Sequence, residues 1–285
     1  MKQKIIVLTG PTASGKTKLS IQLAKKIDAE IICADSRIVY KDLDIVSAKP
    51  TQEEQENIVH HLIDIVEPNE DFSAGDFAKK AEEIIKNSKK PIIISGGTWF
   101  YIKSLLDEEK LPACEINPEF RKSLENMDSK ILWEKLNVLD SKRASLIHQN
   151  NKDKIIRSIE LCTFLNMPIS QYKRETNQKY ESFWFMPKIE RTELYERINL
   201  RVDEMIKQGL YDEWQKNNQK YGKTKIIFNT IGYKEFYENE DLNLAIEKIK
   251  QHTRNFAKRQ LTYFKSNSKI KLINTVDEIL KGINN

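Results

Sequence analysis

Residues 10–17 read Gly10-Pro11-Thr12-Ala13-Ser14-Gly15-Lys16-Thr17, which fits the phosphate-loop pattern G-x-x-x-x-G-K-[ST]. The apolar run Ile5-Ile6-Val7-Leu8 precedes this stretch, and a helical pattern over residues 19–24 follows it. A strand, a glycine-rich loop and a helix in this order direct successive backbone N–H groups toward an anion at the helix N-terminus. The order therefore predicts a phosphate-binding loop within an α/β fold.

Four residues of this loop have individual predicted roles. Gly10 and Gly15 lack a Cβ and can adopt dihedrals that other residues avoid. Lys16 brings a mobile positive charge to the outer phosphate, and the hydroxyl of Thr17 is placed to ligate Mg²⁺. We therefore expect a phosphate compound and Mg²⁺ at this loop, although the pattern does not select among phosphate compounds.

The composition is that of a folded protein without membrane spans. The chain has 285 residues, 39% of them hydrophobic, and a mildly basic formal net charge of +5. No apolar run reaches the ~20 residues of a membrane span, and we expect no signal peptide because residues 1–4 lead directly into the first strand. Cys33, Cys114 and Cys162 are far apart in the sequence, so we expect reduced packing cysteines in a cytoplasmic protein.

A carboxylate follows the second predicted strand, residues 29–34, at Asp35. Because the carboxyl ends of parallel strands face the ligand crevice, Asp35 should face whatever the phosphate loop holds. There it could accept a proton from a nucleophile or bind Mg²⁺ through water. The alternative is that Asp35 and Ser36 only cap the turn that follows.

A second glycine turn, Ser95-Gly96-Gly97-Thr98, ends the predicted strand 92–94 and faces the same crevice. Before it, residues 40–50 are predicted to form a charged loop, and residues 60–66 a short strand. His60 and His61 are adjacent on that strand and so point to opposite faces, which makes them a poor metal pair.

The pattern changes near Pro112 to short charged helices, and strand signals return only at Phe183. We therefore predict a core of residues 1–112 and 181–285, interrupted by an all-helical insertion over 113–180. The fold expected is an α/β, P-loop NTPase-like parallel sheet flanked by helices. The insertion's basic side chains favour a lid or nucleic-acid clamp, or else a solvated charged face; they are Arg121, Lys142, Arg143, Lys152, Lys154 and Arg157.

Two helices of the second core segment carry basic side chains. A single long helix is predicted from Arg191 to Trp214, with Arg197 and Arg201 on one face. Such a guanidinium pair suits pyrophosphate, and surface salt bridges are the competing account. The last long helix, around residues 248–265, mixes basic and aromatic side chains, which can bind RNA or simply form a packed amphipathic helix.

An ordered series of motifs along nearly the whole chain resembles the tRNA dimethylallyltransferases, in their bacterial form without a carboxy-terminal zinc finger. The motifs are GPTASGKT at 10–17, DS-x-x-V-Y at 35–40, D-I-x-x-A-K-P at 44–50, HHLID at 60–64, F-S-A-x-x-F at 72–77, GGT-x-x-Y at 96–101, R-x-x-E at 157–160, I-G-Y-K-E at 231–235 and T-R-x-x-A-K-R-Q-x-T at 253–262.

The resemblance implies transfer of a dimethylallyl group from dimethylallyl diphosphate to N6 of the adenosine 3′ of the tRNA anticodon. The phosphate loop and Mg²⁺ would then hold the leaving diphosphate, Arg201 would add charge stabilisation, Thr12 would position the diphosphate and Asp35 would accept the N6 proton. The protein would act as a monomer. The resemblance also implies tRNA contacts by Asp35, Ser36, Arg37, Ile38, Thr98, Arg121, Asp153, Lys154, Ile155, Ile156 and Arg157.

The chain departs from the family pattern at a few of these positions. Ile38 replaces a common Gln, Val46-Ser47 replaces Gly-Thr, and Lys154 replaces an Arg, which keeps the charge but loses the bidentate fork. Other functions stay open from the sequence: an ATP-dependent small-molecule kinase, an adenylate prenyltransferase acting on a free nucleotide, or an RNA-binding protein with a vestigial loop.

Overall fold

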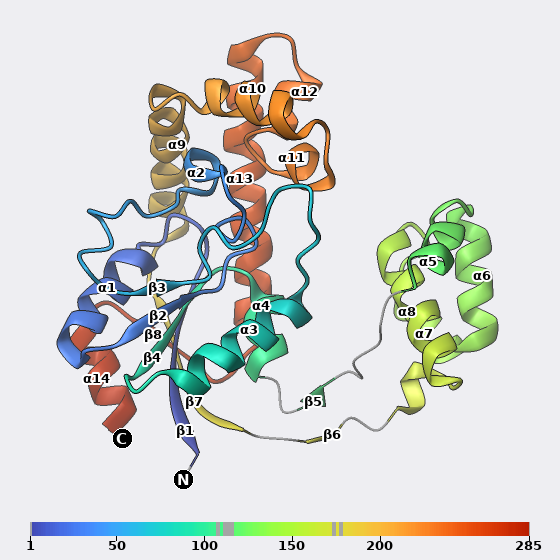
Figure 1. Cartoon of the computed structure of the whole chain (residues 1–285), viewed down its shortest axis with the longest axis horizontal. Helices are drawn as coiled ribbons and strands as arrows, with labels where there is room; N and C mark the ends of the chain where they lie inside the picture. Colours follow the sequence, from blue (N-terminus) through green and yellow to red (C-terminus); the bar gives the residue numbers. More distant parts are fainter. Residues whose placement is uncertain (1, 107–108, 111–116, 173–174, 177–178, 285) are drawn as a thin grey trace. The chain divides into compact units, whose positions relative to one another are not determined.

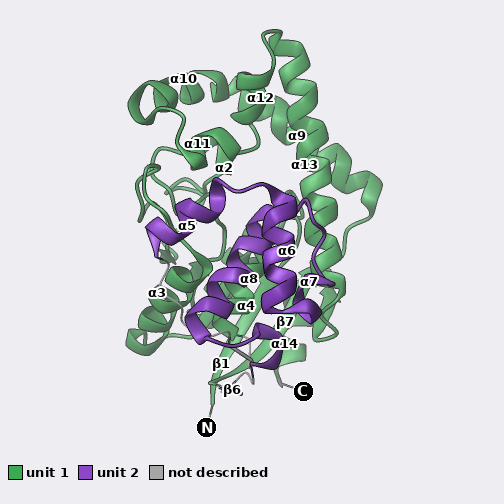
Figure 2. Ribbon diagram, turned by 90° about the vertical axis from the view of Figure 1, so that its right-hand side faces the viewer, with its two compact units in different colours: residues 1–107, 178–285 green, residues 108–177 purple. Residues whose placement is uncertain are grey.

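A computed structural model describes residues 2–106, 109–110, 117–172, 175–176 and 179–284. The chain divides into two units, one formed by residues 1–107 and 178–285 and the other by residues 108–177 (Figure 2). The limits of the inserted segment predicted from the sequence are residues 113 and 180.

A six-stranded parallel sheet runs through the first unit, in the order β3-β2-β4-β1-β7-β8 (Figure 1). The registers pair Thr9 with Gly96, and Cys33 with Ser95, so β1, β2 and β4 end at the same edge. The phosphate loop, Asp35 and the second glycine turn all follow these ends. The strands are β1 Gln3–Thr9, β2 Glu30–Cys33, β3 His60–His61, β4 Ile92–Gly96, β7 Tyr180–Pro187 and β8 Ile270–Ile273.

Helices cover both faces of this sheet because alternate strand residues point to opposite sides. Ile5 and Val7 pack into one core with side chains of α3 and α4, whereas Ile6 and Leu8 pack into another with side chains of α1 and α14. The predicted α/β fold with helices flanking a parallel sheet is confirmed. The helices are α1 Lys16–Ile27, α2 Asp44–Ser47, α3 Ala74–Asn87, α4 Trp99–Leu106, α9 Arg191–Lys207, α10 Leu210–Tyr221, α11 Lys225–Asn229, α12 Lys234–Glu238, α13 Leu242–Lys265 and α14 Val276–Asn284.

Three local predictions for the first unit are wrong. The helix predicted over 191–214 is broken, because Gly209 has a φ of +96° and separates α9 from α10. The strand predicted over 60–66 stops at His61, because Leu62 and Asp64 adopt positive φ and turn the chain out of the extended conformation. The predicted loop 40–50 contains the short helix α2.

The second unit consists mainly of helices around its own core. Side-chain caps begin its helices: Asn117 caps α5 Pro118–Glu125, Asp128 caps α6 Ser129–Leu139, Asp140 caps α7 Ser141–Ala144 and Asn151 caps α8 Lys152–Leu165. A 3₁₀ turn, Ile169–Gln171, follows. The prediction of an all-helical insertion misses one short pair of strands in this unit. β5 Glu109–Lys110 pairs antiparallel with β6 Glu175–Thr176.

Two expectations concern the cysteines and the membrane. Cys33 and Cys162 are buried free thiols, and Cys114 lies outside the described residues. Within the part of the chain that the structure describes, the helices are too short or too polar to span a bilayer.

Candidate active site

The phosphate loop has the backbone geometry of an anion site. Gly10 and Gly15 have φ of +153° and +86°, and Ala13 adopts a left-handed φ of +61°. Helix α1 begins at Lys16 without a side-chain cap at Gly15, so the N–H groups of its first turn remain available to an anion. The Ser14 hydroxyl oxygen is buried and has no hydrogen-bond partner among the described residues. A buried hydroxyl without a protein partner inside such a loop fits a polar ligand bound there.

Two cavities meet beside this loop. The first, of about 470 Å³, is lined by residues 12–18 of the loop and by Asp35 and Arg201. The second, of about 460 Å³, is lined mostly by the 229–235 segment and by α9 and α13. Both cavities share six lining residues, so they adjoin there; these are Thr12, Lys16, Asp35, Ser47, Ala48 and Arg201.

Asp35 lies at this junction, just past the end of β2. One of its carboxylate oxygens accepts the Arg37 backbone N–H at 2.8 Å. The turn-capping geometry expected of Asp35 therefore exists, and the same side chain lines both cavities. A single carboxylate can serve both purposes because its other oxygen remains for a ligand.

Two cationic side chains flank Asp35. The Lys16 ammonium donates to the Pro11 carbonyl at 3.2 Å, and Arg201 Nη1 donates to Thr12 Oγ1 at 3.3 Å. Burial lowers the pKa of Lys16 to about 8, with Asp35 opposing and Arg201 adding to the shift. Burial also lowers the pKa of Arg201, and Asp35 opposes this change. Partly desolvated cations of this kind interact strongly with an anionic ligand.

Arg197 lies on the same side of α9 as Arg201. Its guanidinium pairs with Glu193 at 2.6 Å, so Arg197 forms the surface salt bridge that was the alternative to pyrophosphate binding. The same guanidinium lies near the loop, since a Cβ placed on Gly15 would be 3.6 Å from Arg197 Nη1. The structure therefore brings both arginines toward the loop, with Arg201 the more enclosed of the two.

The second glycine turn is held against the loop by a residue that has no predicted role. Gln260 of α13 accepts the Thr12 N–H at 2.9 Å and donates to the Gly97 carbonyl at 2.9 Å. A Cβ on Gly97 would lie 2.2 Å from Gln260 Nε2, so a larger residue there would displace the Gln260 amide from its position beside the Gly97 carbonyl. The sequence does contain a signal for a buried polar residue at this position, because helical spacing places Gln260 on the inward face between Ala257 and Phe264.

The two histidines take different positions. His60 Nδ1 donates to the Ile58 carbonyl at 2.8 Å, and its buried Nε2 has no partner among the described residues although His60 lines the first cavity. Burial lowers the pKa of His60. His61 instead contacts Glu30 at 2.9 Å. The described residues contain no group of three or more His, Cys, Asp or Glu side chains placed to hold a metal. A metal here would depend on Thr17, which lines the first cavity, and on oxygens of the ligand itself.

Four predicted tRNA contacts lie near the junction of the cavities. Ser36 and Arg37 line the second cavity, and Ile38 lines the first. The Thr98 hydroxyl accepts the Ser36 N–H at 3.0 Å. The structure thus gathers these residues around Asp35.

The remaining predicted contacts belong to the second unit. Arg121 and Arg157 both donate to the buried carboxylate of Glu160, at 3.2 and 3.3 Å. Asp153 and Lys154 are exposed in the first turn of α8. Ile155 and Ile156 are 0% and 1% exposed, and their side chains pack in the unit's core. The role of the 153–157 segment in tRNA binding stays a prediction.

Comparison with known proteins identifies relatives along nearly the whole chain. The family model described as IPP transferase matches residues 38–267. The tRNA dimethylallyltransferase of Anoxybacillus flavithermus is 40% identical, over 98% of this chain and 93% of its own length. That of Bacillus subtilis is 39% identical, over 94% and 90%.

Solved structures agree with this assignment. The tRNA isopentenylpyrophosphate transferases from Bacillus halodurans and Staphylococcus epidermidis superpose with TM-scores of 0.74 and 0.72, at 34% and 38% identity. They cover 99% of this chain each, and 96% and 99% of their own chains. A eukaryotic dimethylallyltransferase described as acting on tRNA gives a TM-score of 0.82 at 28% identity, over 96% of this chain and 74% of its own. This chain therefore belongs to the IPP transferase family, together with the tRNA dimethylallyltransferases.

Proposed function

We propose that this transferase moves a dimethylallyl group from dimethylallyl diphosphate to N6 of the adenosine 3′ of the anticodon in tRNA. The N6 lone pair forms a bond to the allylic carbon while the bond from that carbon to the diphosphate oxygen breaks. The N6 proton passes to a base, and diphosphate leaves. The observation that carries the proposal is the position of Asp35 at the junction of the two cavities, beside the phosphate loop.

The first cavity suits the diphosphate. Backbone N–H groups of the loop and of the first turn of α1 can donate to its oxygens. Lys16 and Arg201 bring positive charge to the same place, from two different elements. Negative charge grows on the diphosphate as the C–O bond breaks, so these fixed donors stabilise the transition state more than the bound substrate. Thr12, which receives the Arg201 hydrogen bond, would orient the leaving group.

The second cavity suits the adenine base. Apolar and aromatic side chains line it, among them Met205, Ile249 and Phe256, together with polar groups such as Gln260. A base entering here must leave the anticodon-loop stack, as in other enzymes that modify a nucleobase. Its N6 would then meet the allylic carbon at Asp35, whose carboxylate accepts the proton.

Magnesium fits the residues present. Thr17 lines the first cavity at the start of α1, and Mg²⁺ is commonly held by few protein oxygens together with phosphate oxygens and water. When bound, the ion would neutralise charge on the departing diphosphate. The fit does not require a protein carboxylate cluster.

Binding of the tRNA would use basic side chains of both units. In the first unit, α13 carries Arg254, Lys258 and Arg259, and Arg259 lies over the Phe256 ring at 5.8 Å. In the second unit, Lys154 is exposed and Arg121 and Arg157 surround Glu160. We propose that these residues neutralise tRNA phosphates. Since the substrate is a tRNA, we place the reaction in the cytoplasm.

A direct assay tests the proposal. The protein is incubated with undermodified tRNA, dimethylallyl diphosphate and Mg²⁺, without ATP, and the digested RNA is analysed by mass spectrometry. We expect one prenylated adenosine and release of inorganic diphosphate. Reactions that lack the prenyl donor, or contain ATP in its place, serve as controls. An unmodified product from folded protein, or turnover of ATP, would contradict the proposal.

A further inference from the structure

Glu213 of α10 lies outside both cavities, yet its carboxylate collects four hydrogen bonds. Three come from consecutive backbone N–H groups of α2, those of Asp44 at 3.0 Å, Ile45 at 2.6 Å and Val46 at 3.0 Å. The fourth comes from the Tyr233 hydroxyl at 2.7 Å.

Helix α2 depends on this carboxylate. It has only four residues, and its N-cap, Leu43, provides no side-chain acceptor. An isolated turn of this length is not stable in water, since helix nucleation is unfavourable. Glu213 supplies both the missing acceptor and a negative charge at the positive end of the helix.

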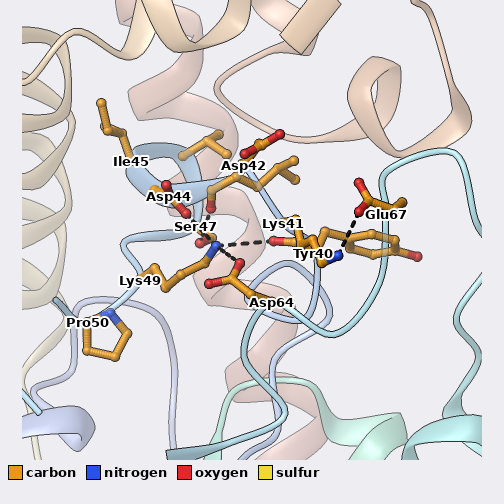
Figure 3. A network of polar contacts seen from close by, with 12 residues as sticks. Tyr40, Lys41, Asp42, Asp44, Ile45, Ser47, Lys49, Pro50, Asp64 and Glu67 are labelled. Carbon is orange, nitrogen blue, oxygen red and sulfur yellow. Dashed lines mark hydrogen bonds and ion pairs between the residues drawn. The ribbon is translucent and has the colours of Figure 1, made fainter. Parts of the chain in front are cut away.

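The other end of α2 is also fixed. Ala48 closes it with a left-handed φ of +49°. The ammonium of Lys49, whose side chain is only 7% exposed, then contacts the carboxylates of Asp44 and Asp64 and the carbonyl of Tyr40 (Figure 3). Contacts therefore hold α2 at both ends, with Glu213 at its N-terminus and Ala48 and Lys49 at its C-terminus.

This segment forms the wall where the two cavities meet. Ser47 and Ala48 line both cavities, and Val46 lines the second. Val46 also packs closely against the 229–235 segment, because a Cβ on Gly232 would lie 2.7 Å from Val46 Cγ2. A shift of α2 thus changes the boundary of the space beside Asp35.

We propose that Glu213 is a positioning residue, which sets the position of α2 and thereby the shape of the cavity that receives the adenine. The identity of the substrate in this inference, the adenine of a tRNA, rests on the proposed function. The hydrogen bonds on which the inference depends are independent of that identity.

The test is Glu213→Gln, which preserves the size of the side chain. A glutamine has one acceptor oxygen in place of two, and its NH₂ group opposes the N–H donors of α2. We expect the amides of Asp44, Ile45 and Val46 to exchange hydrogen about tenfold faster, since charge-assisted hydrogen bonds are lost. In the prenylation assay we expect the KM for tRNA to rise about tenfold, more than kcat falls, because α2 shapes a binding wall and not the reacting groups.

Glu67→Gln is the matched control. Glu67 accepts a hydrogen bond from Lys41 in the neighbouring network (Figure 3). It also accepts one from the Tyr221 hydroxyl, and it does not bind the N–H groups of α2 that contact Glu213. It should leave both the exchange of α2 and the KM unchanged.

Two readouts separate the possible failures. If wild-type protein does not prenylate tRNA, the proposed function fails, but exchange at α2 still tests whether Glu213 positions it. If exchange at α2 is the same in Glu213→Gln and wild type, or if exchange rises while the KM for tRNA does not, the positioning role is overturned.

Discussion

The side-chain oxygen of Gln260 accepts the backbone N–H of Thr12 at 2.9 Å, across 248 residues of sequence. The amide of the same side chain donates to Gly97. A single buried side chain on α13 thus joins the phosphate loop to the second glycine turn. It thereby fixes the distance between the loop that we propose binds the diphosphate and the turn that follows β4.

Replacement of Gln260 by methionine should weaken this junction. The variant keeps the length of the side chain but leaves the Thr12 N–H and the Gly97 carbonyl without partners. We expect a loss of about 1–3 kcal/mol in the free energy of unfolding, measured by urea denaturation, together with a lower kcat. Gln251→Met, at an exposed position of the same helix, is the control and should change neither quantity. Equal stability of both variants would contradict the role assigned to Gln260.

Gln260 shows which part of the site could be predicted from the sequence and which could not. The phosphate loop is a local structure, so Gly10, Gly15, Lys16 and Thr17 reveal it by their spacing alone. Asp35 was predictable because parallel strands end at a common edge. A contact between Gln260 and Thr12 depends on how α13 packs, which no local pattern contains.

The same distinction explains the errors in the fold. Gly209 marks the break between α9 and α10, but a glycine inside a helical pattern is compatible with either a break or a continuous helix. Three N–H groups of helix α2 donate to Glu213 of the distant helix α10, a contact that the residues of α2 themselves do not reveal. By contrast, the apolar helical pattern that includes Ile155 and Ile156 does correspond to buried side chains in the core of the second unit.

The pKa of Lys16 predicts how diphosphate affinity changes with pH. In the free protein its ammonium is charged below about pH 8 and increasingly neutral above it. Diphosphate binds the charged form and raises this pKa, so the affinity contributed by Lys16 falls as the pH rises through about 8. The ratio of the Kd of Lys16→Met to that of wild type should shrink by about tenfold between about pH 7 and about pH 9.

Isothermal titration with inorganic diphosphate and Mg²⁺ measures this ratio. Titration of the ligand itself affects both proteins equally, so the ratio isolates the lysine. A ratio that stays constant over this range would show that Lys16 remains charged throughout it.

In the second unit, Glu160 should hold two arginines in place. Its side chain is 4% exposed and pairs with Arg121 and Arg157, which are 23% and 39% exposed. Glu160→Gln removes the charge that both guanidiniums contact. We expect the free energy of unfolding of this unit to fall by about 1–2 kcal/mol. The loss should be smaller than for a fully buried ion pair because water screens the exposed arginines. Hydrogen exchange along α8 measures the change.

Glu125→Gln is the control for this prediction, because Glu125 pairs with the same Arg121 from a half-exposed position. Its effect should stay below about 0.5 kcal/mol. If both variants change exchange in α8 equally, burial of Glu160 does not distinguish the two ion pairs.

Asp35→Asn tests the proton acceptor. An asparagine oxygen can still accept the Arg37 N–H, so the turn after β2 should be preserved, but the neutral amide cannot take the N6 proton. We expect the single-turnover rate of prenylation to fall by about 10²–10⁴, the range for loss of a general base, while affinity for the anticodon stem-loop is retained. Asp277→Asn, at an exposed carboxylate of α14 that pairs with Lys26, should leave both rate and affinity unchanged. If Asp35→Asn prenylates tRNA at the wild-type rate, Asp35 is not the proton acceptor. Its role would then be the hydrogen bond with the Arg37 N–H, which an asparagine oxygen can also accept.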